Sequence, residues 1–163
     1  GSCYPETHPE APDEDTDLDN LVRKVDAGAD FLITQLFFCN DDFLRFRDRA
    51  ATRGISVPIL AGIMPILSLR QVKRFTDMCG AAIPTDLLSK MEAVEDDTNA
   101  VRQLGTCHAV EQCIGLLEGG VAGLHFYTLN RSTATRAIYQ QLRGLFPKKS
   151  NSAQLSLEFE SGR

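Results

Sequence analysis

The sequence predicts an α/β fold whose parallel βα units form about half of a (β/α)8 TIM barrel. Apolar segments rich in β-branched and aromatic residues alternate with helical patterns along the chain, which is typical of repeated βα units around a parallel sheet. A complete barrel needs about 250 residues, with a lower limit of roughly 200. The 163 residues of this chain therefore cannot close a barrel alone.

The first predicted elements are the end of a strand and a helix. Cys3-Tyr4 is expected to end the strand. A loop over residues 6–16 leads to a helix over residues 17–27, which Gly28 is expected to end as a cap. The acidic run at residues 13–15 is interpreted as a solvated approach to the N-terminus of this helix.

Two more strands and a helix are predicted next. Residues 31–37 have the composition of a strand, and residues 41–53 that of a helix that ends at Gly54. The third strand is expected over residues 57–62.

The rest of the chain is predicted to be mainly helical. Ser68 is expected to cap a helix that carries Val72, Phe75 and Met78. The remaining predicted elements are a strand over residues 122–126 and helices over residues 84–91, 97–118 and 132–142. From residue 147 onward the composition shifts toward Lys, Ser and Gln, so this tail is expected to be disordered. The alternation over residues 154–159 would also suit an edge strand or a swapped contact.

Composition and charge exclude several classes of protein. Hydrophobic residues make up 43% of the chain, enough for one core. No apolar run approaches the roughly 20 residues of a membrane span, and no signal peptide begins the chain, which favours a soluble cytoplasmic protein. The formal net charge is −5, with 17 basic residues scattered among 22 acidic ones, which argues against a nucleic-acid surface.

The cysteines predict neither disulfides nor a metal site. There are five of them, an odd number, and no two form a Cys-x-x-Cys pair. A disulfide framework and a zinc site both need such pairing or spacing. We therefore expect reduced thiols that are mostly buried.

One predicted helix has a polar stripe beside its apolar face. Asp17, Asn20 and Lys24 are spaced i, i+3 and i+7, so they share one stripe. The apolar face next to it carries Leu18, Val22 and Val25. A basic side chain in such a stripe can bind phosphate, and Asp and Asn can bind hydroxyl groups. From spacing alone, the pattern favours a solvated helix with a few ion pairs over a binding site.

Polar residues also lie at the expected carboxyl ends of strands, where parallel α/β proteins build their sites. Gln35 ends a strand in which Phe31 and Ile33 share its side, so its amide is expected at the barrel mouth. Gln71 and Phe75 form an i,i+4 pair on one helix face. The alternatives are that Gln35 satisfies loop backbone groups and that Phe75 fills the core.

Three segments resemble the methylenetetrahydrofolate reductase family. They are Tyr4-Pro5-Glu6-Thr7-His8-Pro9-Glu10-Ala11, Ile33-Thr34-Gln35-Leu36-Phe37-Phe38 and His125-Phe126-Tyr127-Thr128-Leu129-Asn130-Arg131. The resemblance extends from Tyr4 to about Leu142 and covers only the C-terminal half of the family's catalytic barrel, so residues 1–146 are expected to form that half.

The resemblance implies a set of binding residues. Those expected to bind FAD are Tyr4, His8, Ala11, Asp17, Asn20, Arg23 and Lys24. Those expected to bind the folate substrate are Gln35, Gln71, Phe75 and Arg131. Without the resemblance, His8 reads as a turn residue, and Asn130-Arg131 as the start of the last helix.

The implied activity is the reduction of 5,10-methylenetetrahydrofolate to 5-methyltetrahydrofolate, with NADH or NADPH as reductant and FAD as the hydride carrier. The family's proton donor is a glutamate on the first strand, outside this chain, so no catalytic residue is assigned here. The chain is expected to need an N-terminal half-barrel, or a second copy, to cover its sheet, and to have little or no activity alone. The alternative is a half-barrel module without catalysis, which binds flavin or phosphate or self-associates.

Overall fold

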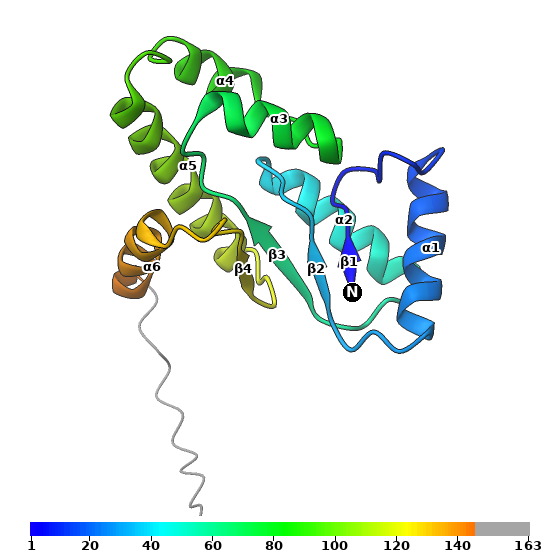
Figure 1. The fold of residues 1–163 in the computed structure, drawn as a ribbon. Coiled ribbons are helices and arrows are strands. Elements are labelled where there is room, and N and C mark those ends of the chain that lie inside the picture. Colours follow the sequence, from blue (N-terminus) through cyan, green and yellow to red (C-terminus); the bar gives the residue numbers. More distant parts are fainter. Residues whose placement is uncertain (146–163) are drawn as a thin grey trace, which may run out of the picture.

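The computed structural model describes residues 1–145, and a parallel sheet lies at the centre of this part (Figure 1). Its strands are β1 (Ser2–Cys3), β2 (Leu32–Thr34), β3 (Ile59–Ile63) and β4 (Leu124–Phe126), paired in the order β1-β2-β3-β4. Strands that neighbour in sequence also neighbour in space, as in a barrel and unlike a doubly wound sheet. The predicted α/β architecture of parallel βα units is confirmed.

Six helices accompany the sheet in the described part of the chain. They are α1 (Glu14–Asp26), α2 (Asn40–Thr52), α3 (Leu69–Cys79), α4 (Thr85–Glu92), α5 (Thr98–Glu118) and α6 (Thr133–Leu145). None of the described helices is long and apolar enough to cross a membrane.

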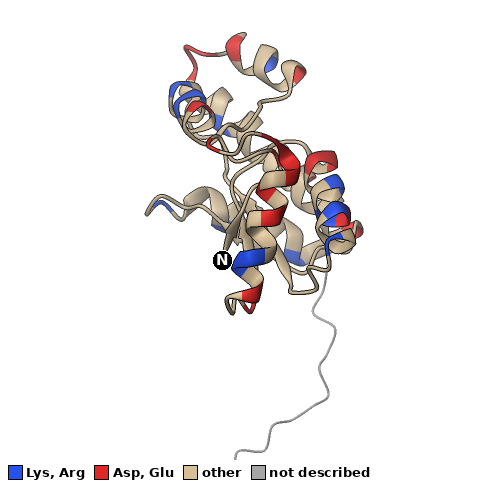
Figure 2. Cartoon of the chain, turned by 90° about the vertical axis from the view of Figure 1, so that its right-hand side faces the viewer, with Lys and Arg blue, Asp and Glu red and all other residues tan. Residues whose placement is uncertain are grey.

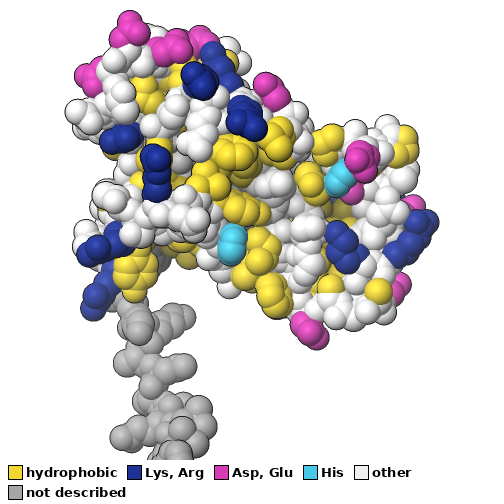
Figure 3. All heavy atoms as spheres, in the orientation of Figure 1, with side chains coloured by type: hydrophobic (Ala, Val, Ile, Leu, Met, Phe, Trp, Pro, Cys, Tyr) yellow, Lys and Arg dark blue, Asp and Glu magenta, His cyan; other side chains and the backbone are white. Residues whose placement is uncertain are grey.

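The helices cover one face of the sheet and leave the other uncovered. Leu32 and Thr34 of β2 are fully buried, and the larger apolar cluster joins the strands to α1, α2, α5 and α6. Ile33 and Gln35 point to the opposite face and are only half-buried. Figure 3 shows hydrophobic side chains gathered across the middle of this uncovered face. We call it the inner face, because it corresponds to the interior of a closed barrel.

Helices α3 and α4 lie beyond the carboxyl ends of the strands rather than against the sheet (Figure 1). They enclose a second apolar cluster, which includes Leu36, Ile66 and Met91. The loop after β1 meets the end of α3, where the Glu6 carboxylate accepts the Ala82 N–H at 2.9 Å. Helices α3 and α4, together with the loop after β1, therefore lie over the carboxyl ends of the strands, which form the mouth of the half-barrel.

Most helix boundaries agree with the prediction because their capping signals operate. Ser68 accepts the Gln71 N–H, and Asp97 accepts the Ala100 N–H at 3.1 Å. The first helix is the exception, since it begins at Glu14 rather than at residue 17. Asp13 is its cap, because its carboxylate accepts the Thr16 N–H at 2.7 Å.

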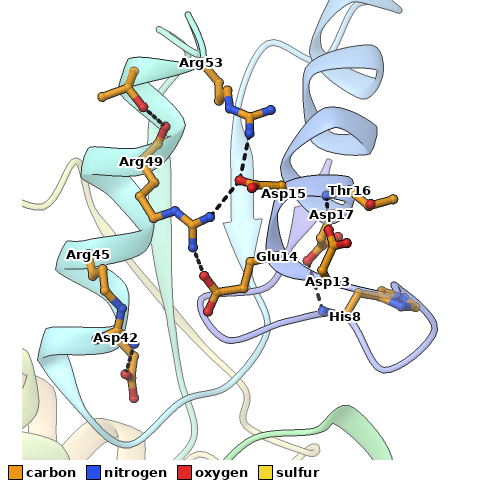
Figure 4. Close-up of polar contacts among 11 residues, drawn as sticks. His8, Asp13, Glu14, Asp15, Thr16, Asp17, Asp42, Arg45, Arg49 and Arg53 are labelled. Atoms are coloured by element: carbon orange, nitrogen blue, oxygen red, sulfur yellow. Dashed lines mark hydrogen bonds and ion pairs between the residues drawn. The ribbon is translucent and has the colours of Figure 1, made fainter.

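As expected, the acidic run at residues 13–15 is exposed and stands at the N-terminus of α1, but it belongs to the helix end itself rather than to a preceding loop. Glu14 and Asp15 lie in the first turn, where Arg49 of α2 pairs with both and Arg53 pairs with Asp15 at 2.7 Å (Figure 4). Arg53 also pairs with Asp19. Figure 2 shows acidic residues toward the first end of α1 and basic ones toward its last turn, which suits the helix dipole. The network joins α1 to α2.

Two apolar residues lie differently from the prediction, whereas the cysteines are mostly buried, as expected. Strand β2 starts at Leu32, and the Phe31 side chain is 47% exposed because it flanks the uncovered face. Met78 is 66% exposed, so it does not belong to the packed face of α3. All five cysteines are free, and three are buried, whereas Cys39 is half-buried and Cys107 is exposed. The expected tail, residues 147–163, lies outside the described residues.

We predict that Gly105→Ala destabilises the chain strongly. Gly105 lies inside α5 where the helix crosses the loop after β3, and a methyl group there would overlap the backbone carbonyl of Ile66. Overpacking against a backbone atom should cost about 2–4 kcal/mol of unfolding free energy. Urea denaturation measures it. Gly144→Ala in α6, where a methyl group meets open space, is the control and should change stability by under about 1 kcal/mol.

We predict that His108 makes the chain less stable in acid. Its ring nitrogen Nε2 contacts the Phe38 carbonyl oxygen at 3.1 Å, and burial lowers the pKa of His108. A lowered pKa means that this stability is present above pH about 6.5, the usual value, and is lost as the pH falls through the folded-state pKa. Between pH 7 and pH 5, the urea midpoint of His108→Gln should fall less than that of the wild type. The midpoint of His125→Gln should fall as much as that of the wild type. Equal acid loss in wild type and His108→Gln would contradict the prediction.

Candidate functional site

The carboxyl ends of the strands open into a pocket of about 250 Å³, which we call the mouth pocket. Its lining combines strand-end residues with one face of α3. The residues are Tyr4, Gln35, Leu36, Met64, Phe75, Met78, Cys79, Tyr127 and Leu129. The structure thus brings the predicted residues Tyr4, Gln35 and Phe75 together, although they are separated by up to 71 positions in the sequence.

A second pocket of about 160 Å³ adjoins the mouth pocket, and we call it the side pocket. It holds the predicted residues Gln71, Phe75 and Arg131. Four residues line both pockets: Met64, Phe75, Tyr127 and Leu129. The four predicted folate residues therefore surround one continuous region, with Gln35 in one pocket and Arg131 in the other.

A third pocket of about 100 Å³ lies between β1 and α1, and we call it the edge pocket. Its lining includes most of the residues predicted to bind FAD, namely Tyr4, His8, Asp17, Asn20 and Lys24. Tyr4 also lines the mouth pocket, so the two regions meet at its ring. Ala11 and Arg23, the other two predicted residues, do not line these three pockets.

Several candidates already have local hydrogen bonds. The Asp17 carboxylate accepts the backbone N–H of His8 at 3.0 Å, and the His8 ring lies edge-on to Tyr4 with centroids 4.4 Å apart. Lys24 donates to the Ser2 carbonyl oxygen at 2.5 Å. These contacts shape the edge pocket and leave the exposed Lys24 ammonium at its rim.

His8, Gln35 and Phe75 each make the local contact that was considered as an alternative to ligand binding. His8 does act as a turn residue, since its Nδ1 accepts the Glu10 N–H at 3.1 Å. Gln35 does satisfy a loop backbone group, because its Oε1 accepts the Leu36 N–H at 2.9 Å. That bond leaves the amide NH2 of Gln35 for another partner. Phe75 is half-buried against the second apolar cluster and also lines both pockets.

The floor of the mouth pocket depends on residues that the sequence analysis did not single out. The buried Thr34 hydroxyl accepts the Gly62 N–H at 2.8 Å, and the Tyr127 hydroxyl donates to the Thr34 carbonyl oxygen at 2.8 Å. A side chain on Gly62 would overlap the Thr34 carbonyl oxygen and the Tyr127 ring. The sequence gives one indication of Tyr127, because this residue belongs to the segment 125–131 that carries the family resemblance. Only the folded structure shows that its partner is Thr34.

Burial also sets the protonation of groups near the mouth. Burial, followed by the charges that Cys3, Tyr4 and Cys79 would carry if ionised, raises the pKa of Tyr127, so its hydroxyl remains a donor at neutral pH. Burial raises the pKa of Cys3 to about 12. It also raises the pKa of Glu6, whose carboxylate is engaged by the Ala82 N–H. These groups shape the mouth and do not present a free acid to it.

The edge pocket suits the polar part of a dinucleotide cofactor better than a metal ion. Lysine and histidine donors stand beside carboxylate and amide acceptors along one side of α1, which is the donor set that phosphate and hydroxyl groups require. Within the described residues, no group of three or more His, Cys, Asp or Glu side chains is placed to hold a metal ion.

Comparisons with known proteins identify the family of the chain. The family model "Methylenetetrahydrofolate reductase" matches residues 2–143. The 5,10-methylenetetrahydrofolate reductase of Escherichia coli is 43% identical over 141 residues, which are 86% of this chain and 48% of the relative. Methylenetetrahydrofolate reductase 2 of Saccharomyces cerevisiae is 40% identical over 142 residues, covering 85% of this chain and 24% of the relative.

A solved structure supports the fold. It is an uncharacterized protein from Clostridium thermocellum that binds two copies of 5-methyl-5,6,7,8-tetrahydrofolic acid, with a TM-score of 0.59 and 18% identity, over 90% of this chain and 53% of that one. The chain spans about half the length of the Escherichia coli relative and about a quarter of the length of the Saccharomyces cerevisiae relative. With a family match over residues 2–143 and 43% identity to a curated member, the chain belongs to the methylenetetrahydrofolate reductase family.

Proposed function

We propose that this chain forms the C-terminal half of a catalytic barrel that reduces 5,10-methylenetetrahydrofolate to 5-methyltetrahydrofolate with FAD and NADH or NADPH. One observation carries the proposal: the residues expected to bind folate and most of those expected to bind FAD line adjoining pockets, and Tyr4 lines both the mouth pocket and the edge pocket. A hydride transfer requires two ligands in direct contact, and adjoining pockets at the carboxyl ends of parallel strands provide that arrangement.

The folate half of the proposal rests on the mouth and side pockets. The free amide NH2 of Gln35 can donate to the pterin edge, because Oε1 already accepts from Leu36. Phe75 offers an aromatic surface between the two pockets. The exposed Arg131 and Gln71, which both line the side pocket, would supply donors for the carboxylates of the ligand. The neighbouring fold that binds methyltetrahydrofolate supports this substrate class.

The flavin half of the proposal rests on the edge pocket. Lys24, with Arg23 on the adjacent exposed surface of α1, would neutralise the diphosphate, and Asp17 and Asn20 would accept from hydroxyl groups. His8 and Tyr4 would border the ring system, and the half-buried Ala11 would contact it from the loop before α1. FAD, when bound, would accept a hydride from NAD(P)H and pass it to the folate.

The chain's own residues would bind and orient rather than exchange protons. Hydride addition to the methylene group gives the methyl group only if the ring opens, and opening requires a proton on the departing nitrogen. Tyr127 remains protonated but its hydroxyl is directed to the Thr34 carbonyl oxygen. We therefore propose that the acid comes from the other half of the barrel, which would also cover the inner face.

We predict a separation of function between Lys24→Ala and Gln35→Ala. In a barrel completed with the first half of the Escherichia coli relative, Lys24→Ala should lower flavin affinity about tenfold, since one charged contact is worth about 1.4 kcal/mol or more, and should change the folate KM little. Gln35→Ala should do the reverse. Flavin absorbance after gel filtration and steady-state kinetics measure the two effects. Lys90→Ala and Gln140→Ala, both exposed and outside the pockets, are the matched controls.

Complementation tests the proposal as a whole. The isolated chain should show no turnover, and mixing or fusing it with the first half of the relative should restore NAD(P)H-dependent formation of 5-methyltetrahydrofolate, because the acid and the missing wall arrive with that half. A completed barrel that retains FAD but never reduces folate would refute the activity. A chain that forms stable homodimers through its inner face and rejects the added half would favour the structural alternative.

A further inference from the structure

The C-terminal end of α3 is bonded to the loop after β1. The N–H groups of Gly80 and Ala81 bond back to the Thr76 carbonyl oxygen, as in an ordinary helix cap. The N–H that follows, that of Ala82, is accepted by both oxygens of the half-buried Glu6 carboxylate, at 2.9 and 3.2 Å. We call this contact the Glu6 bridge. A hydrogen bond to a carboxylate is stronger than one between neutral groups.

A close backbone approach accompanies the Glu6 bridge. Gly80 has a left-handed backbone, with φ at +69°. A side-chain carbon on Gly80 would lie 3.2 Å from the Pro9 ring and 3.6 Å from the Thr7 carbonyl oxygen. The loop therefore packs directly on the cap of α3, although 76 positions separate Glu6 from Ala82 in the sequence.

The two segments that the bridge joins border different pockets. Glu6 stands between Tyr4 and His8 in the sequence, and both of these line the edge pocket. Helix α3 contributes Phe75 and Cys79 to the mouth pocket, and the Cys79 thiol donates to the Phe75 carbonyl oxygen at 2.9 Å. The bridge thus connects the loop beside the edge pocket to one wall of the mouth pocket.

The position of the Phe75 ring depends on the orientation of α3. This helix lies beyond the carboxyl ends of the strands rather than against the sheet (Figure 1), and Ser68 caps its first end. From Leu69 to Phe75 the helix rises about 9 Å, at about 1.5 Å per residue. A tilt of about 10° around the first turn would move the ring by about 1.5 Å, and a misplacement of about 1 Å can already cost about a hundredfold in rate.

We propose that Glu6 is a positioning residue, which fixes the C-terminal end of α3 through the Ala82 N–H and so sets the separation of Phe75 and Tyr4 across the mouth pocket. This inference rests on the proposed function, because it assumes that a folate occupies the mouth pocket beside a flavin. Glu6 lines neither the mouth pocket nor the edge pocket. It therefore acts through α3 and not on a ligand.

Two substitutions separate the acceptor of Glu6 from its charge. Glu6→Ala removes the bridge, whereas Glu6→Gln removes the charge and keeps a carbonyl oxygen for the Ala82 N–H. In the barrel completed with the first half of the Escherichia coli relative, Glu6→Ala should weaken the affinity for 5-methyltetrahydrofolate about five- to tenfold. Glu6→Gln should stay within about twofold of the wild type, as should Glu10→Ala, which removes an exposed carboxylate from the same loop. Anaerobic calorimetry with reduced flavin measures these affinities without hydride transfer.

A double-mutant cycle tests whether the bridge acts through the wall of the mouth pocket. Once Phe75→Ala has removed the ring, the further loss caused by Glu6→Ala should shrink to less than about twofold. The affinity for FAD should stay near the wild-type value, because the Asp17 carboxylate accepts the His8 N–H at 3.0 Å without the help of Glu6. A residue that only stabilised the fold would weaken both ligands and would add to Phe75→Ala.

Hydrogen exchange reports on the bridge in the absence of folate. In the completed barrel, the backbone N–H groups of residues 80–82 should exchange several-fold faster in Glu6→Ala than in the wild type, because the end of α3 then opens more easily. Glu6→Gln should exchange at nearly the wild-type rate. Equal exchange in Glu6→Ala and the wild type would refute the fixing of α3 by Glu6.

The outcomes distinguish the inference from the proposed function. A wild-type barrel that keeps FAD and binds no folate refutes the folate site, and the role of Glu6 in binding fails with it. Wild-type binding that Glu6→Ala leaves unchanged refutes the positioning role while the folate site stands. Full additivity with Phe75→Ala would also refute that role, and so would an equal loss of affinity in Glu6→Gln and Glu6→Ala.

Discussion

The close approach of three strands at Gly62 is the constraint on which the site depends. Because Gly62 has no side chain, the Thr34 hydroxyl can accept its N–H, and the Tyr127 ring can lie over it and donate to the Thr34 carbonyl oxygen. Thr34 is fully buried, so each of these polar groups needs its partner. The bonds tie the carboxyl ends of β2, β3 and β4 together and so place Gln35, the residue after Thr34, at the mouth.

The half-barrel divides its structural and binding roles between its two faces. Helices α1, α2, α5 and α6 bury the outer face of the sheet in one apolar cluster, and Arg49 and Arg53 join α2 to the acidic first turns of α1. The inner face stays uncovered, the mouth and side pockets lie at the carboxyl ends of the strands, and the edge pocket lies between β1 and α1. The candidate binding residues are thus held by elements whose other side is already packed, which keeps them in place without using the candidate surface for stability.

The pattern of the chain predicted the parallel order and most helix boundaries, because caps such as Ser68 and Asp97 act over a few residues. It misplaced the start of α1, since Asp13 and the residues after it can be either solvated loop or first turn until Arg49 supplies a partner from another helix. It also assigned too much of residues 31–37 to a strand. The segment after Thr34 leaves the ladder and is held instead by Gln112 of α5, whose amide donates to the Phe37 carbonyl oxygen at 2.8 Å.

The candidate residues Gln35, Phe75, Arg131 and the stripe on α1 could be named from the sequence, because residue type and position relative to a strand end or helix face are local properties. Their arrangement could not. Whether Gln35 and Arg131 share a continuous region, whether Tyr4 joins the mouth and edge pockets, and whether Leu129 adopts a left-handed backbone all depend on contacts between segments far apart in the chain. Spacing within a strand or helix fixes which way a side chain points, but only the packing of strands and helices against one another decides what it meets.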